Sequence, residues 1–168
     1  MASLKKLLDA ANKSPLNRWI VNRILWHKIP FNKPHQPTIR AFHANGATIG
    51  LAFKKQNKNH LNSIHACALI TLAEYTSGLV LLAALGPKSY RLIMKSIDAV
   101  FHYQAKTDVI AHFELTDQEI QQIKTSLTHQ EAILLPLSIP IYDQANQIVC
   151  TVNVNWQLKN WQAVKTII

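Results

Sequence analysis

The pattern of apolar and polar positions predicts a helical first part of the chain. Leucines recur at helical spacing near the start, and Ser14-Pro15 then supplies an N-cap with a proline at the first helical position. The apolar face of this second helix comprises Leu16, Trp19, Ile20 and Ile24. We expect this face to cover an apolar flank of the sheet predicted below. Residues 28–37 contain three prolines and predict an irregular connector.

A hairpin and one long helix are predicted next. Segments 38–44 and 47–55 are typical of strands, and Asn45-Gly46 between them is the dipeptide best suited to a tight hairpin. A helix then runs from about Ile64 to Leu85 and is closed by Gly86-Pro87. This helix is apolar nearly all round, as expected of a helix wrapped by other structure.

Strands dominate the remainder of the sequence. Four are expected, over residues 91–105, 108–115, 131–143 and 148–158. Thr116 and Glu119 form a capping box, which predicts a short helix between the second and third of these strands. Pro136 and Pro140 cannot donate to a ladder, so the third strand should be bulged or lie partly at an edge. The pattern predicts an α+β protein in which a mostly antiparallel, curved sheet wraps one central helix. We divide it into a helical lead with its connector, residues 1–37, and a main domain, residues 38–168.

Charge is distributed unevenly along the chain. The 18 Lys and Arg residues outnumber the 9 Asp and Glu residues, and eleven of the basic residues lie within residues 1–58. Between Asp9 and Asp98 the only acid is Glu74. Such a surface favours an anionic partner, which could be a phosphorylated ligand, a nucleic acid or a lipid headgroup. No glycine-rich or interleaved aromatic and basic motif supports nucleic acid, which is therefore the least favoured partner.

The two cysteines and the beginning of the sequence bear on location. Cys67 and Cys150 form no disulfide framework, and we expect both to be reduced thiols. The first residues lack a continuous apolar run of signal-peptide length, so a cytoplasmic location is expected. Residues 64–85 are long enough to span a bilayer, but Glu74 at the centre would be costly in lipid. A helix buried in protein explains the segment better.

Residues 59–74, NHLNSIHACALITLAE, resemble the signature of a known family. The positions that match are Asn59, His65 and the run Leu72-Ala73-Glu74, in which the acid follows the histidine by nine residues. This signature resembles that of hotdog-fold thioesterases of the phenylacetyl-CoA thioesterase class, in a subgroup with a helical lead. Asn62, Ala66 and Cys67 stand where that class has glycines.

The resemblance implies a hotdog fold, hydrolysis of an acyl thioester such as acyl-CoA, and a homodimer, with a tetramer left open. No cofactor or metal is expected, and the eight histidines show no metal-ligand spacing. The backbone amides of Ala66 and Cys67 at the helix start would form an oxyanion hole. Glu74 would activate water or attack directly. Eight residues of helix are about 12 Å, so the acid would come from the partner subunit and give two composite sites.

Each remaining site residue also has a simpler interpretation. Glu74 could be a buried structural acid that accepts hydrogen bonds. Asn59 would orient the substrate carbonyl or water, or it would cap a turn in the loop. His65 would bind the thioester region, although a role in fixing the loop is favoured. Cys67, with His60 and His65 nearby, could be a nucleophile, but a small thiol filling a glycine position is the more ordinary interpretation.

Two groups of basic residues are candidates for binding the phosphates of coenzyme A. They are Lys54, Lys55 and Lys58 before the signature loop, and Lys88 and Arg91 after the helix. Both groups could equally be solvated surface. Three functions therefore remain: an acyl-thioester hydrolase, a non-catalytic acyl or acyl-CoA binder that has lost turnover, and, least favoured, a binder of nucleic acid or membrane surface through the basic lead.

Overall fold

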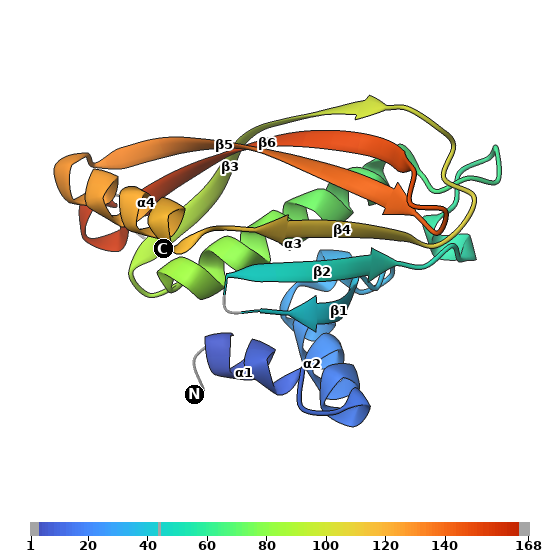
Figure 1. Cartoon of the computed structure of the whole chain (residues 1–168), viewed down its shortest axis with the longest axis horizontal. Coiled ribbons are helices and arrows are strands. Elements are labelled where there is room, and N and C mark those ends of the chain that lie inside the picture. The colour runs from blue at the N-terminus through green and yellow to red at the C-terminus, as the bar shows by residue number, and fades with distance from the viewer. Residues whose placement is uncertain (1–3, 44, 165–168) are drawn as a thin grey trace.

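The computed structural model describes residues 4–43 and 45–164. Six antiparallel strands form one curved sheet in the order β1-β2-β4-β5-β6-β3, and the sheet wraps the long helix α3 (Figure 1). The strands are β1 Thr38–Phe42, β2 Gly46–Leu51, β3 Tyr90–Phe101, β4 Val109–Glu114, β5 Ala132–Asp143 and β6 Ile148–Asn160. The helices are α1 Leu4–Ala10, α2 Pro15–Lys28, α3 Ala66–Leu85 and α4 Asp117–His129, with short 3-10 turns at Pro30–Asn32, Lys55–Asn57 and Trp161–Ala163. This is the predicted α+β architecture, a hotdog fold with an N-terminal helical part.

Helix α3 is the centre of the core. It packs against strands β2 to β6, and most of its side chains are buried. Gly86 ends it with a left-handed φ of 86°, and its amide donates to Leu82 O, as the Gly86-Pro87 stop predicted. By length and composition α3 could cross a bilayer. However, 67% of its apolar 18-residue stretch is buried inside the protein. The apolar character of α3 is thus explained by the sheet that surrounds it.

The later strands follow the predicted pattern. In β6 the alternate residues Val152, Val154, Trp156 and Leu158 are buried, at 0–4% exposure. Strand β5 pairs with β6 along most of its length but with β4 only through Ile141 to Asp143, so its proline-containing first part lies at an edge. A register irregularity follows at Ile141 and Tyr142. The Thr116–Glu119 capping box is formed and begins α4, which packs against β5 and β6.

The two edge strands of the sheet differ in whether their free backbone edge is covered. Along β1, the side-chain amides of Asn12 and Asn22 each donate to and accept from the backbone, at Phe42 and Ile39 respectively. These asparagines take the place of a neighbouring strand and cover the edge. Strand β3 at the other edge pairs only with β6 within the part of the chain that the structure describes, and it exposes Ile93, Met94, Val100 and Phe101 at 41–52%.

The orientation of α2 corrects one prediction. The helix packs inward through Val21, Asn22 and Leu25, whereas its predicted apolar face points to solvent. That face does not cover the sheet: the exposures are 64% for Leu16, 59% for Trp19, 41% for Ile20 and 36% for Ile24. The helix is apolar on two sides, so spacing alone cannot choose between them. On the inward side, the Asn22 amide donates to Ile39 O and accepts from Ile39 N, between the buried side chains of Val21 and Leu25.

Candidate active site

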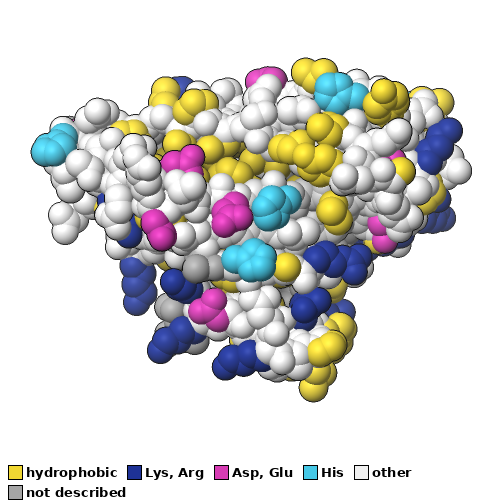
Figure 2. Space-filling model, viewed as in Figure 1, with side chains coloured by type: hydrophobic (Ala, Val, Ile, Leu, Met, Phe, Trp, Pro, Cys, Tyr) yellow, Lys and Arg dark blue, Asp and Glu magenta, His cyan; other side chains and the backbone are white. Residues whose placement is uncertain are grey.

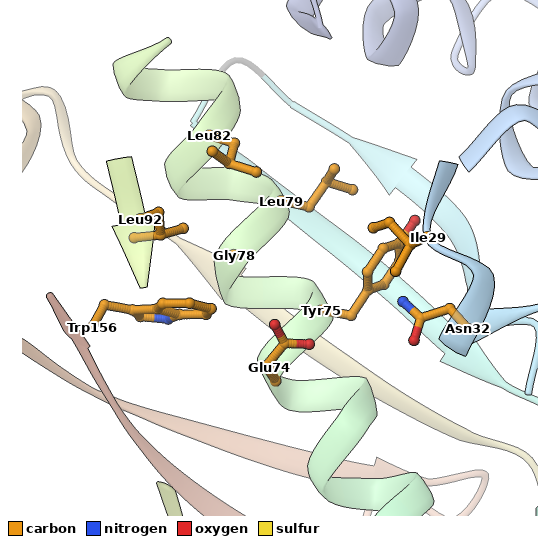
Figure 3. A pocket seen from close by; sticks show the side chains of 9 residues that line it. All are labelled: Ile29, Asn32, Glu74, Tyr75, Gly78, Leu79, Leu82, Leu92 and Trp156. Carbon is orange, nitrogen blue, oxygen red and sulfur yellow. The ribbon is translucent and has the colours of Figure 1, made fainter. Parts of the chain in front are cut away.

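A cavity of about 190 Å³ lies beside the middle of α3, where the helical lead meets the sheet. Glu74 and Tyr75 come from α3, Asn32 from the turn after α2, and Trp156 from β6 (Figure 3). The other lining residues are Gly78, which has no side chain, and the apolar Ile29, Leu79, Leu82 and Leu92. The cavity therefore combines an apolar wall with a few polar groups, which is the usual composition of a small-molecule site.

Glu74 is half-buried in this cavity. Burial raises the pKa of its carboxyl group, because the charged form loses solvation there. No described residue donates a hydrogen bond to the carboxylate; the nearby Ser77 hydroxyl bonds the backbone carbonyls of Ala73 and Glu74 instead. Within the described residues, Glu74 is thus not the hydrogen-bonded structural acid of the simpler interpretation. A buried acid with a raised pKa that faces a cavity is characteristic of functional sites.

Asn32 and Tyr75 add two further polar groups that sequence reasoning missed. Both side chains are buried, at 1% and 4% exposure, and neither the Asn32 amide nor the Tyr75 hydroxyl has a hydrogen-bond partner within the described residues. Burial first, and then the charge of Glu74, raise the pKa of Tyr75, so its hydroxyl keeps its proton and can donate. In Figure 3 the Tyr75 side chain lies between Glu74 and Asn32, and all three line the same cavity. Asn32 lies in the proline-rich connector, where no periodic pattern could have pointed to it.

The loop before α3 is shaped by Asn59. Its Oδ1 accepts hydrogen bonds from the amides of Leu61 and Ser63, at 2.9 and 3.2 Å, and from the Ser63 hydroxyl at 3.2 Å. This is the turn-capping role, and it leaves only Nδ2 to meet a ligand. Asn62, which stands at a glycine position of the resembled signature, has a left-handed φ of 54°. Asparagine tolerates that conformation better than most residues, so the turn survives without glycine.

The start of α3 provides one free amide rather than two. His65 is the N-cap, and its Nδ1 accepts a hydrogen bond of 3.1 Å from the amide of Cys67. Because Nδ1 is an acceptor here, Nε2 carries the proton and can donate outward. The amide of Ala66 has no acceptor among the described residues. Of the two predicted oxyanion donors, Ala66 is available and Cys67 is occupied.

A second cavity, of about 160 Å³, lies at this end of α3. It brings Asn59 and Ala66 together with residues from the end of β3 and the segment after it, among them Phe101, Tyr103 and Ala105. Glu74 is not part of it. In the described chain, Glu74 thus lies in one cavity and Asn59 and Ala66 in another, as expected from eight residues of helix, about 12 Å, whereas His65 and Cys67 line neither.

The remaining candidates are more dispersed. The Cys67 side chain is exposed, and no hydrogen bond joins its sulfur to an imidazole among the described residues. Lys54 donates to Gln36, and burial lowers its pKa, while Lys58 lies over the Phe53 ring at 3.7 Å. Lys88 and Arg91 follow the far end of α3, about 30 Å from the loop, so the two basic groups are not neighbours in one protomer.

Comparison with known proteins places the chain in a family. Residues 17–158 match the domain of unknown function DUF4442, and the protein belongs to that family. A search of curated protein sequences gives no match.

Solved structures share the hotdog fold at low sequence identity. A Pseudomonas aeruginosa protein of unknown function, described as a probable thioesterase, is 22% identical over 83% of this chain and 93% of its own, with a TM-score of 0.78. A Haemophilus influenzae thioesterase is 13% identical over 95% of this chain and 92% of its own, with a TM-score of 0.61. A mutant thioesterase from Staphylococcus aureus is 14% identical over 77% of this chain and 98% of its own, with a TM-score of 0.62.

Proposed function

We propose that this protein hydrolyses an acyl thioester, with acyl-CoA as the substrate class. The observation that carries the proposal is Glu74, a partly buried carboxylate with no hydrogen-bond donor among the described residues, facing a cavity that is otherwise largely apolar. An apolar wall suits an acyl chain, and a desolvated carboxylate is a strong base. The thioesterases among the structural neighbours agree with this reaction class.

The proposed reaction needs only groups of the chain and water. Ionised Glu74 takes a proton from water as the oxygen attacks the thioester carbon. The amide of Ala66, at the positive end of the α3 dipole, donates to the developing oxyanion. The C–S bond then breaks, the protonated Glu74 returns its proton to the leaving thiolate, and a carboxylic acid and a free thiol are released. The Asn59 Nδ2 group would orient the substrate carbonyl or water, and the His65 Nε2 group would bind the thioester region.

The two cavities would be joined in a homodimer that pairs the free edges of β3. Leu92 near the start of β3 lines the Glu74 cavity, and Phe101 at its end lines the Ala66 cavity. Antiparallel pairing of β3 with its copy about a two-fold axis sets the start of one strand against the end of the other. The Glu74 cavity of one protomer would then lie beside the Ala66 cavity of its partner. The exposed apolar side chains of β3 would be covered by the same contact.

The experiment is a panel of acyl-CoA substrates of different chain lengths, with the released thiol measured colorimetrically. We expect hydrolysis by the native chain, its loss in Glu74→Gln and its persistence in Cys67→Ala. Loss in Cys67→Ala with persistence in Glu74→Gln would move the nucleophile to sulfur and overturn the proposal.

The second candidate is a non-catalytic acyl-CoA binder. One observation favours it: the Cys67 amide is occupied by His65, and side chains stand where the resembled signature has glycines, so the oxyanion site is reduced. Saturable acyl-CoA binding by calorimetry, without thiol release from any substrate in the panel, would select this function.

A further inference from the structure

The outer face of α2 carries a group of partly to largely exposed apolar side chains. Leu16, Ile20 and Ile24 follow one another at four-residue spacing, and Trp19 lies beside them. Past the end of the helix, Ile29 and Phe31 are also exposed, at 38% and 66%. We define the α2 face as these residues: Leu16, Trp19, Ile20, Ile24, Ile29 and Phe31. Isolated exposed apolar residues are normal, but six of them within sixteen residues, including Trp and Phe, are typical of an interaction site.

Positive charge borders the α2 face. Arg23, Lys28 and Lys33 are exposed along its length, and the Arg23 guanidinium lies 5.6 Å from the centre of the Trp19 ring. The sequence contains no acid between Asp9 and Glu74, so no negative residue of this helix or its connector offsets the charge. In Figure 2 the lower lobe, which is the helical lead, carries Lys and Arg around its sides and hydrophobic side chains at its lower tip.

We propose that the α2 face docks on an anionic lipid surface. Helices that lie in a membrane interface insert an apolar side with Trp, Phe or Leu while Lys and Arg meet the headgroups. The α2 face has this composition, and its basic border complements phosphate headgroups rather than a neutral bilayer. Nucleic acid would match the charge but not the apolar row. A second protomer would place two basic borders against each other, which costs electrostatic free energy.

The docking surface reaches the Glu74 cavity. Ile29 is exposed on the α2 face and also lines that cavity, and Asn32, one turn further on, lines it too. A protein docked through α2 therefore holds the cavity wall close to the lipid. This juxtaposition suits an acyl ligand that partitions into membranes, although docking itself does not depend on the proposed hydrolysis.

The test is co-sedimentation of the full chain with vesicles. We expect binding to vesicles of equal parts phosphatidylcholine and phosphatidylglycerol, little binding to phosphatidylcholine alone, and release at high salt. Leu16→Ser with Trp19→Ser should abolish binding, and Arg23→Ser with Lys28→Ser should weaken it on the order of tenfold. The matched control is Leu134→Ser with Ile148→Ser, two apolar residues that are 54% and 40% exposed elsewhere on the surface.

Two kinds of result would overturn the proposal. One is the absence of vesicle binding, or binding that survives Leu16→Ser with Trp19→Ser. The other is a change of oligomeric state in the same double variant, measured by light scattering without lipid, which would show that a second protomer covers the α2 face. Circular dichroism of each variant establishes that the fold is retained. Because no thioester is present, failure here is distinct from failure of the proposed hydrolysis.

Discussion

The indole Nε1 of Trp156 donates a hydrogen bond of 3.1 Å to the hydroxyl of Ser77, joining β6 to the turn of α3 that follows Glu74. Both residues are buried, at 4% and 0% exposure. Gly78 lies under the same ring, where an added Cβ would be only 3.2 Å from the indole. The wall of the Glu74 cavity is therefore fixed by one polar contact and one close approach of ring to backbone.

Ser77→Ala should destabilise the protein by about 1–3 kcal/mol, because the Trp156 N–H loses its acceptor while remaining buried. Adding Trp156→Phe removes the orphaned donor, so the double variant should lose less stability than the sum of the single variants. Denaturant unfolding gives the free energy of unfolding of the two single variants and of the double variant. Thr71→Ala is the control: its hydroxyl makes the same backward bond, to Cys67 O at 2.8 Å, but has no partner on another element. Additive losses would contradict the coupling.

The raised pKa of Glu74 makes stability and activity respond to pH in opposite directions. The folded state holds the Glu74 proton more tightly than the unfolded chain, where an ordinary glutamate has a pKa of about 4.3. This contribution to stability is complete below that value and is lost as pH rises through the raised pKa. The proposed base, in contrast, is active only when ionised, so hydrolysis should increase over the same pH window.

Glu74→Gln separates these two effects. The variant should be inactive, yet more stable than the native chain at neutral pH, with the difference disappearing below about pH 4.3. Thermal unfolding across pH provides the stability curve, and thiol release provides the rate. A native chain whose stability, relative to Glu74→Gln, rises with pH would show that Glu74 has a favourable partner in solution.

Asn32→Leu should stabilise the ligand-free protein by about 1 kcal/mol, because it removes two buried polar atoms that have no partner. The same change should raise the KM for acyl-CoA if the amide meets the ligand in the Glu74 cavity. The buried amide of Asn57, which is fully hydrogen-bonded to the Ala52 and His35 backbone and to the His35 ring, is the comparison: Asn57→Leu should destabilise. A loss of stability in Asn32→Leu would indicate a hydrogen-bonding role in the folded protein.

Ala66→Pro tests the oxyanion donor with little damage to the helix. Proline is favoured at the first helical position, the amide of Ala66 has no acceptor to lose, and His65 before it has the extended conformation that proline requires (φ −65°, ψ 139°). Hydrolysis should fall by a factor on the order of 100 to 1,000 while stability stays nearly unchanged. Ala66→Ser, which keeps the N–H, is the matched control.

Mixing two inactive variants tests the composite site. A dimer of one Glu74→Gln chain and one Ala66→Pro chain carries one site with both defects and one with neither. Refolding the two variants together should therefore restore part of the activity, whereas each alone stays inactive. No recovery, despite mixed dimers detected by mass spectrometry, would place both groups of each site in the same chain.

Interactions between residues close together in the sequence determined much of the secondary structure of this protein. The N-cap at Ser14, the stop at Gly86, the capping box at Thr116 and the alternation in β6 were readable because each depends on residues within a few positions of one another. The same reasoning predicted one apolar helix wrapped by a mostly antiparallel sheet, and it singled out Glu74, because a lone acid in an apolar helix must have a reason to be there.

Only the tertiary structure decided how the pieces meet. It turned the predicted apolar face of α2 outward, because Val21 and Leu25 pack inward together with Asn22, which is hydrogen-bonded to Ile39 of β1. It brought Asn32 into the same cavity as Glu74, 42 positions away in the sequence, and it engaged the Cys67 amide in a hydrogen bond to the His65 ring. A side chain's partner is set by the packing of distant segments, and spacing along the chain carries no information about which polar atom will be left unpaired.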